Sequence, residues 1–206
     1  MSLFITFEGG EGSGKSVQAR ALYRKLSRLP IPVVLTHEPG VTPLGKKIAR
    51  WLKWGQDAIS AETELMLFNA SRAQLVTGVI KPSLESGRVV ICDRYSDSTT
   101  AYQSYGRGLD LDMVKSVNDA AIQGLKPDLT ILLDMPVEAG LARKRDRKHD
   151  RFEQEHITFH KRVREGYLEM AAGKPGRWLV VDASQSKEKV AKIIWEKVSK
   201  LLPDTR

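Results

Sequence analysis

The feature that most constrains the fold is a glycine-rich octapeptide near the N-terminus, Gly-Gly-Glu-Gly-Ser-Gly-Lys-Ser at residues 9–16. It matches the pattern G-x-x-x-x-G-K-[ST], in which glycines let backbone N–H groups curl around an anion without side-chain clashes. An apolar run at residues 3–7 precedes it, and a helical pattern from about Lys15 to Ser27 follows it. This context predicts a phosphate-binding loop between a strand and the N-terminus of a helix.

Two side chains of this loop have specific roles in the predicted site. Lys15 is expected to reach the β- and γ-phosphates of ATP, and the Ser16 hydroxyl is expected to ligate Mg²⁺. The other residues of the predicted ATP site are Gly9, Gly10, Glu11, Gly12, Ser13, Gly14 and Val17. The sequence contains no Asn-Lys-x-Asp tetrapeptide, which would select guanine, and 206 residues are few for a motor core. A small-molecule kinase is therefore favoured.

Short apolar runs alternate with helical patterns along the whole chain. The expected strands are residues 3–7, 32–36, 88–92, 128–133 and 178–181. The expected helices are residues 15–27, 44–53, 60–84, 96–124 with interruptions at Gly106 and Gly108, 136–145, 152–172 and 187–201. This alternation predicts a parallel sheet with helices on both faces, within a single domain that spans residues 1–206.

The cysteine and the histidines offer little chemistry. Cys92 is the only cysteine, and its apolar surroundings predict a small buried side chain rather than a nucleophile. His156 and His160 are four residues apart, but further ligands at suitable spacing are missing, so we expect solvated surface side chains. The N-terminal segment has no basic region and apolar runs fall short of the ~18 residues of a membrane span, so we expect a cytoplasmic protein without membrane contact.

Residues after the expected third strand complete the predicted chemistry. Arg94 is placed to grip the phosphate of an acceptor with a bidentate guanidinium. Asp93, at the end of the strand, is placed to hold Mg²⁺ directly or through water. The alternative is a local ion pair between these two neighbours at the strand end. We favour the functional interpretation because a phosphate loop needs an acidic partner.

Together with these residues, further motifs resemble those of the thymidylate kinase family, in the family's order and over nearly the whole chain. The segments are Phe7–Ser16, Glu38–Gly45, Leu67–Gln74, Cys92–Tyr95, Ala101–Gln103, Asp150–Glu153 and Asp182–Gln185. The resemblance implies a doubly wound α/β P-loop kinase with strand order 2-3-1-4-5. It also implies phosphoryl transfer from ATP to dTMP with Mg²⁺, giving ADP and dTDP, and a homodimer formed through helices.

The resemblance also assigns the acceptor site. Phe68 and Arg72 are four residues apart and share one face of a helix. From spacing alone Phe68 is more often a core residue. The family pattern instead implies that Phe68 stacks on thymine and that Arg72 donates to a thymine oxygen. The other residues that the resemblance places around the acceptor are Glu11, Glu38, Pro39, Arg94, Ser98, Thr99, Tyr102 and Gln103. Tyr102 is expected to crowd a ribose 2′-hydroxyl and so favour deoxyribose.

The net charge of +8 leaves two explanations, a nucleic-acid surface or a site for polyanionic small molecules. A basic run at residues 143–151 lies between two expected helices and lacks aromatic residues for base stacking. It resembles the mobile lid of a monophosphate kinase, about residues 143–152, which closes on the phosphates of ATP. The phosphate loop has no arginine, so the resemblance gives this role to the lid, with Arg143, Arg147 and Arg151 as candidates. We therefore attribute most of the excess charge to the lid.

Three positions depart from the family pattern: His37 stands where Arg is common, Val41 where Gly is common and Ser71 where Asp is common. They leave the preference among monophosphates open. One rival hypothesis is a kinase for another nucleotide or for a deoxynucleoside. The other is a P-loop ATPase that binds nucleic acid through the basic run, although we expect no nucleic-acid partner.

Overall fold

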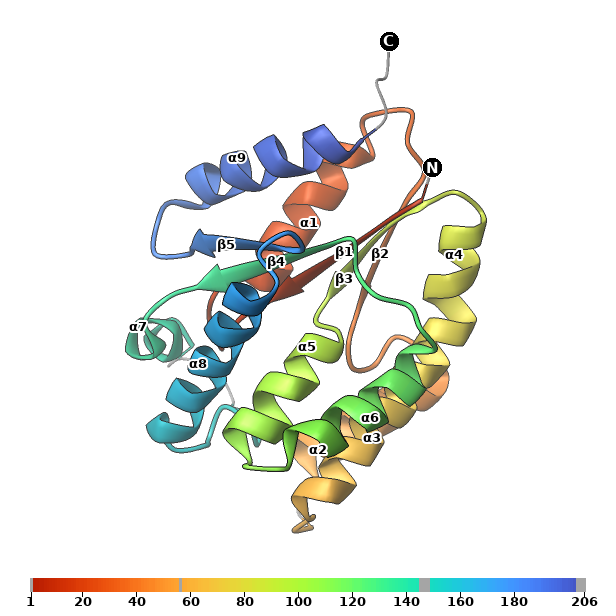
Figure 1. Cartoon of the computed structure of the whole chain (residues 1–206). Helices are drawn as coiled ribbons and strands as arrows, with labels where there is room; N and C mark the ends of the chain where they lie inside the picture. The colour runs from red at the N-terminus through yellow and green to blue at the C-terminus, as the bar shows by residue number, and fades with distance from the viewer. Residues whose placement is uncertain (1, 56, 145–148, 203–206) are drawn as a thin grey trace.

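The fold is a five-stranded parallel sheet covered by helices on both faces (Figure 1). The computed structural model describes residues 2–55, 57–144 and 149–202. The strands are β1 Leu3–Glu8, β2 Val33–His37, β3 Val89–Asp93, β4 Leu129–Asp134 and β5 Trp178–Asp182, in the order β2-β3-β1-β4-β5. This order confirms the prediction. All six residues of β1 are buried, as expected for a central strand that helices cover on both sides.

Helices α1 (Lys15–Leu26) and α9 (Lys187–Val198, followed by the 3₁₀ turn η3, Ser199–Leu201) cover one face of the sheet. Side chains alternate along a strand, so Leu3, Ile5 and Phe7 of β1 all point toward these two helices. Phe4 points the other way and joins a second core with Tyr95, where the two rings meet edge to face at 5.0 Å.

The opposite face of the sheet is covered by a longer series of helices. They are α2 Pro43–Trp54, α3 Ala61–Leu75, π-helix η1 Val76–Ile80, α4 Lys81–Glu85, α5 Ser96–Thr99, π-helix η2 Thr100–Gly106, α6 Leu111–Ile122, α7 Val137–Ala142 and α8 Ile157–Gly173. Ser60 is the N-cap of α3, because its hydroxyl accepts the Thr63 N–H at 3.2 Å. Gly106 lets α8 approach η2, since a Cβ there would lie 2.6 Å from Phe159 Cε2.

The long helix predicted from Phe152 starts later, at Ile157. The side chain of Asp150 accepts the backbone N–H groups of Phe152 and Glu153, both at 3.1 Å. This local bonding folds residues 151–155 as turns instead of a first helical turn. His156 then caps the helix, so the aromatic side chain of Phe152 is held on a turn and not on a helix face.

The histidine prediction was wrong for His160, which is 4% exposed and lies beside the Phe159 ring. It shares one face of α8 with Val163 and Tyr167, and that face packs on the core. Burial lowers the pKa of His160 from its usual value. The predicted burial of Cys92 is confirmed, since the side chain is fully buried in the core between the sheet and α3.

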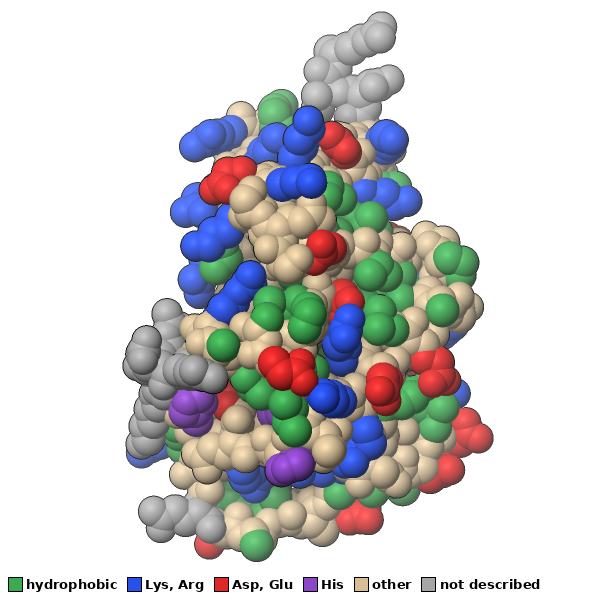
Figure 2. Space-filling view, turned by 90° about the vertical axis from the view of Figure 1, so that its left-hand side faces the viewer, with side chains coloured by type: hydrophobic (Ala, Val, Ile, Leu, Met, Phe, Trp, Pro, Cys, Tyr) green, Lys and Arg blue, Asp and Glu red, His purple; other side chains and the backbone are tan. Residues whose placement is uncertain are grey.

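The positive charge is spread more widely than the lid prediction required. Lys and Arg side chains gather on the upper part of the face in Figure 2, where Figure 1 has α9. The exposed cations on and next to α1 and α9 are Arg20, Arg24, Lys25, Arg28, Lys187, Lys189, Lys192 and Lys200. The lid therefore accounts for only part of the excess, because the solvent faces of these two helices are basic as well. Among the described residues, no helix combines the length and the apolar character needed to cross a membrane.

Candidate active site

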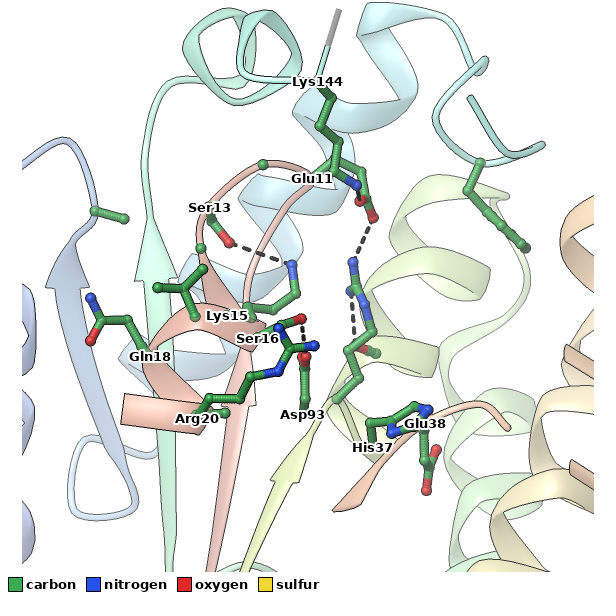
Figure 3. Close-up of a pocket in the computed structure, with 18 of the residues that line it drawn as sticks. Glu11, Ser13, Lys15, Ser16, Gln18, Arg20, His37, Glu38, Asp93 and Lys144 are labelled. Atoms are coloured by element: carbon green, nitrogen blue, oxygen red, sulfur yellow. Dashed lines mark hydrogen bonds and ion pairs between the residues drawn. The ribbon is translucent and has the colours of Figure 1, made fainter. Parts of the chain in front are cut away.

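A cleft of about 1100 Å³ opens at the carboxyl ends of the strands (Figure 3). Its walls come from the phosphate loop, the ends of β2 and β3, helix α3, η2, the described part of the lid and the start of α9. β1 lies between β3 and β4, so successive connections leave the sheet in opposite directions there. In open α/β sheets this point is where ligands bind.

The phosphate loop has the left-handed backbone that glycine permits. Gly12 has a φ of 70° and Gly14, the N-cap of α1, has a φ of 91°. A Cβ on Gly12 would lie 1.9 Å from the carbonyl oxygen of Gly140 in α7, so a larger residue would displace the loop. The sequence pattern therefore describes both the backbone conformation and the close packing of the loop against the helix that precedes the lid.

Lys15 is buried beneath this loop. Its Nζ donates to the carbonyl oxygens of Gly9 at 2.9 Å and Gly10 at 2.7 Å. Burial, together with the nearby Arg94 guanidinium, lowers the pKa of Lys15 to about 8. At the end of the loop the exposed Ser16 hydroxyl donates to Asp93 Oδ2, which brings these two oxygen atoms together (Figure 3).

Arg94 extends from the end of β3 into the cleft. Its φ of 70° is unusual for a residue with a Cβ, and its backbone N–H donates to Phe7 O at 3.0 Å. The guanidinium donates to Glu11 Oε1 at 2.5 Å and to the Tyr102 hydroxyl at 3.2 Å. It also reaches Gly9 O at 3.4 Å, the carbonyl that Lys15 contacts. The two cations therefore lie next to each other.

The carboxylate of Glu11 lies near cations from three parts of the chain. Burial raises the pKa of its carboxyl, but Arg94, Lys15 and Lys144 outweigh burial and hold the pKa well below its usual value. Lys144 donates to Glu11 Oε2 at 2.6 Å and also contacts Glu153 (Figure 3). Sequence reasoning included Lys144 in the basic run but selected only arginines as lid candidates.

The arginine candidates of the lid have different positions. Arg143 lines the cleft and donates to Ala183 O at 3.2 Å. Arg147 lies outside the described residues. Arg151 is not brought to the cleft: its guanidinium donates to Glu64 Oε2 at 2.9 Å on α3. The reason is the turn at residues 151–155, which directs Phe152 into the cleft and Arg151 toward α3.

A buried carboxylate that sequence reasoning missed supports the turn after β3. Glu8 accepts the Tyr95 N–H at 2.8 Å, the Ser98 hydroxyl at 2.5 Å and the Tyr167 hydroxyl at 3.0 Å. Burial, together with the nearby Asp97 carboxylate, raises the pKa of Glu8 to about 7. Its position at the carboxyl end of β1 is a signal that the sequence contained.

Aromatic rings line the end of the cleft at which the sequence predicts a nucleoside. Phe68 is partly exposed on α3, and its ring centroid lies 5.6 Å from that of Phe152. Tyr102 meets Phe152 edge to face at 6.2 Å. The predicted residues Ser98, Thr99 and Gln103 line the same cleft, as do Glu38 and Pro39 from the turn after β2. The structure thus brings the predicted nucleoside residues together and adds Phe152.

Arg72 lines this end, but it is also a structural residue. It is 1% exposed, and its guanidinium donates to Glu38 Oε2 and to the Thr99 hydroxyl at 2.9 and 2.8 Å. Further bonds go to Asn69, Asn118 and the Tyr95 carbonyl. These partners come from separate elements, so the guanidinium fastens α3 to the turn after β2, to α5 and to α6.

Arg72→Ala should therefore lower the free energy of unfolding as well as acceptor binding. Removing one partner of a buried ion pair leaves Glu38 uncompensated, which costs about 3–5 kcal/mol. Urea unfolding measures this loss. The exposed Arg24 of α1 provides the control, since Arg24→Ala should change the free energy by no more than about 0.5 kcal/mol. A loss below about 1 kcal/mol for Arg72→Ala would contradict the structural role.

The three departures from the family pattern lie in different surroundings. His37 lines the cleft, and its pKa is lowered by burial and by Lys53. Val41 packs on the core between the sheet and α3. Ser71 faces α2, where its Oγ would lie 2.9 Å from a Cβ on Gly45. The serine at this position therefore takes part in the packing of α3 against α2.

Comparison with known proteins agrees with this site. The family model described as thymidylate kinase matches residues 7–194. A thymidylate kinase from Dehalococcoides mccartyi is 57% identical over 203 residues, 98% of each chain. One from Halothermothrix orenii is 48% identical over 200 residues, 95% of this chain and 96% of its own. The crystal structure of the thymidylate kinase from Ehrlichia chaffeensis matches with a TM-score of 0.78 at 33% identity, covering 98% of this chain and 99% of that one. The chain belongs to the thymidylate kinase family.

Proposed function

We propose that the cleft carries out the reaction of this family, the transfer of a phosphoryl group from ATP to dTMP that gives ADP and dTDP. One observation carries the proposal. Lys15 of the phosphate loop and Arg94 of the β3 turn both donate to the Gly9 carbonyl, at 2.9 and 3.4 Å. A cation for the donor phosphates thus lies beside a cation for the acceptor phosphate, as a direct transfer requires.

The protein contributes positioning and positive charge to this transfer. Phosphoryl transfer brings several negative charges together, so prearranged cations lower its barrier most effectively. Lys15 would bind the β- and γ-phosphates and Arg94 the acceptor phosphate. Arg143 and Lys144, which line the cleft from the lid, would approach the phosphates of ATP. The acceptor phosphate is already anionic, so we assign no general base.

Glu11 keeps Arg94 and Lys144 in place for this task. Both cations contact its carboxylate, at 2.5 and 2.6 Å. A phosphate that enters between them offers stronger acceptors in the same position, so the cations would exchange partners without a large movement.

Mg²⁺ fits the oxygen pair that ends the phosphate loop. Ser16 Oγ and Asp93 Oδ2 are in hydrogen-bond contact at the mouth of the cleft. Mg²⁺ prefers oxygen ligands and keeps several waters, so in nucleotide kinases it needs only a few protein ligands beside the phosphates. Ser16 and Asp93 would hold the ion, which would neutralise charge on the phosphates.

The aromatic end of the cleft suits a deoxynucleoside that carries thymine. Phe68 would stack on the base, and the ring of Tyr102 would occupy the space beside the ribose 2′ position. Thr99 and Gln103 supply hydroxyl and amide groups in the same wall. Arg72 would reach a thymine oxygen only by sharing a donor that the protein already uses.

A comparison of dTMP with thymidine tests the acceptor class. Without a 5′-phosphate the acceptor loses the contact with Arg94, so turnover with thymidine should be negligible under conditions where dTMP is converted to dTDP. Chromatographic separation of products detects each reaction. Thymidine as the better acceptor would show that the chain is a deoxynucleoside kinase and overturn the proposal.

We also propose that the protein is a homodimer joined through α2 and α3. Leu44 and Trp51 lie two turns apart on α2 and are 47% and 38% exposed, while Met66 on the adjoining α3 is 51% exposed. Large apolar side chains gathered on neighbouring helices are typical of a protein–protein interface. A second copy of the chain would bury them through the isologous contact of a twofold dimer.

Trp51→Glu should convert the dimer to a monomer, because it introduces a charge on this apolar face. Light scattering on the eluted protein should give twice the chain mass of 23.0 kDa for the native protein and 23.0 kDa for the variant. Val180→Glu is a matched control, since Val180 is 48% exposed on the edge strand β5. A native protein that elutes as a monomer would contradict the proposal.

A further inference from the structure

A buried carboxylate on α3 contacts the nucleoside wall of the cleft from behind. Glu64 is 2% exposed and lies one helical turn before Phe68. It accepts the Gln103 Nε2–H at 2.9 Å and the Arg107 guanidinium at 3.1 and 3.2 Å. It also accepts Arg151 at 2.9 Å. Neither Glu64 nor these two arginines line the cleft, whereas Gln103 does.

The chemistry of Glu64 determines how the Gln103 amide is oriented. A side-chain amide has a donor end and an acceptor end, and either can be turned toward a neighbour. An ionised carboxylate only accepts, so the –NH₂ group of Gln103 must face Glu64. The carbonyl end of the amide is then the end that remains for a ligand in the cleft.

The two arginines hold the Glu64 carboxylate in position. Arg107 donates to both carboxylate oxygens, and Arg151 donates to one of them. Each guanidinium carries only donors, so Glu64 meets both arginines as an acceptor. Arg107 also pairs with Glu155, which precedes α8, so the guanidinium is held from two sides.

We propose that Glu64 is a positioning residue for base selectivity, which acts by presenting the Gln103 carbonyl oxygen to the base. Thymine and uracil carry a hydrogen on N3, whereas cytosine has a lone pair there. An acceptor at this point accepts a hydrogen bond from N3–H of thymine or uracil, and it repels the N3 lone pair of cytosine. The inference rests on the proposed function, since it requires the base to lie at the Phe68 and Gln103 end of the cleft.

Glu64→Gln tests the inference with almost no change of shape. The new amide must place its –NH₂ end at one of the two carboxylate positions. At the Oε1 position it faces one Arg107 nitrogen, and at the Oε2 position it faces the donors of both Arg107 and Arg151. The first arrangement leaves fewer donors unpaired. This arrangement requires the side-chain amide of Gln103 to rotate by about 180°, so that its carbonyl oxygen faces the new –NH₂ group. The rotation directs the Gln103 –NH₂ group into the cleft.

The expected result is a fall in the ratio of kcat/KM for dTMP to kcat/KM for dCMP. We expect about tenfold to hundredfold, the range for a buried donor that faces another donor. The ratio is independent of how much of the variant is folded, because both substrates are measured on the same sample. A merely structural role for Glu64 would lower both values and leave the ratio unchanged.

Two controls use residues of the same region. Glu155→Gln removes the other carboxylate of Arg107 but keeps the contact between Glu64 and Gln103, so the ratio should stay within about threefold of native. Glu62→Gln alters an exposed residue of α3 and should have no effect. Gln103→Met keeps the volume but replaces the carbonyl oxygen with a thioether sulfur, which is only a weak acceptor, so it should lower the ratio even if Glu64→Gln fails to fold.

The outcomes separate this inference from the proposed function. A native enzyme that uses dCMP as well as dTMP would overturn the assignment of the base site. A native preference for dTMP that persists in Glu64→Gln, or in Gln103→Met, would overturn the role of Glu64 and leave dTMP phosphorylation intact.

Discussion

Lys15→Ala is expected to lower kcat by about a thousandfold or more, the effect typical of removing a prearranged charge from a phosphoryl-transfer site. Lys15 is buried under the loop and held by two carbonyl oxygens, so water cannot replace its charge in the same position. Steady-state turnover with saturating ATP and dTMP measures the loss. Lys115→Ala on the exposed face of α6 is the control and should retain native turnover. Activity of Lys15→Ala above a tenth of native would contradict this role.

The same lysine should give the enzyme an upper pH limit. Its pKa is lowered to about 8, so the free enzyme loses this cation as the pH rises above that value. kcat/KM for ATP should therefore decline above about pH 8. Bound phosphates stabilise the charged form, so the decline in kcat should come at higher pH. Lys15→Arg, which stays charged, should lack this limb, even if its overall rate is low.

Arg94→Ala is expected to lower kcat/KM for dTMP by about a hundredfold to a thousandfold, with a much smaller change in KM for ATP. Arg94 is the residue after β3 whose guanidinium lies beside Lys15 and contacts Glu11. Its removal takes away the cation that would bind the acceptor phosphate and leaves Glu11 with one partner fewer. Separate titrations of dTMP and ATP measure the two effects.

Arg94→Lys is the matched variant for this measurement. Position 94 has a φ of 70°, so alanine and lysine are subject to the same backbone cost. Any difference between them reports the side chain. Lysine keeps the charge but loses the two-pronged geometry, so we expect its activity to fall between alanine and native. An effect confined to the ATP titration would place Arg94 in the donor site and contradict the assignment.

The sequence was sufficient for the sheet and for the phosphate loop. Central parallel strands such as β1 are buried on both faces, which makes them continuous apolar runs that are easy to recognise. The residues that follow these strands, Asp93 and Arg94, then meet the loop at one edge of the sheet. Local patterns and one topological rule therefore predict that Asp93 and Arg94 lie beside the phosphate loop.

The rest of the site depends on contacts between distant segments. Arg72 contacts residues as far away as Asn118, and no spacing in the sequence indicates that all its donors are used. Arg151 and Phe152 are neighbours, but the turn capped by Asp150 sends one to α3 and the other into the cleft. Which side of a turn a residue takes is decided by such tertiary bonds, which the sequence pattern does not encode.

Glu8 and Glu64 illustrate the same limit. Both carboxylates are buried, whereas acidic residues are usually exposed and a sequence pattern therefore predicts exposure. Their burial is possible because donors from distant elements surround each carboxylate. These distant donors became visible only with the fold.

The most direct test of the central claim is a panel of acceptors under identical conditions, with ATP and Mg²⁺. Initial rates are measured with dTMP, dUMP, dCMP and dGMP. We predict the highest kcat/KM for dTMP, with dUMP next because it shares the N3–H group and lacks only the methyl. A higher kcat/KM for dCMP or dGMP than for dTMP would contradict the account.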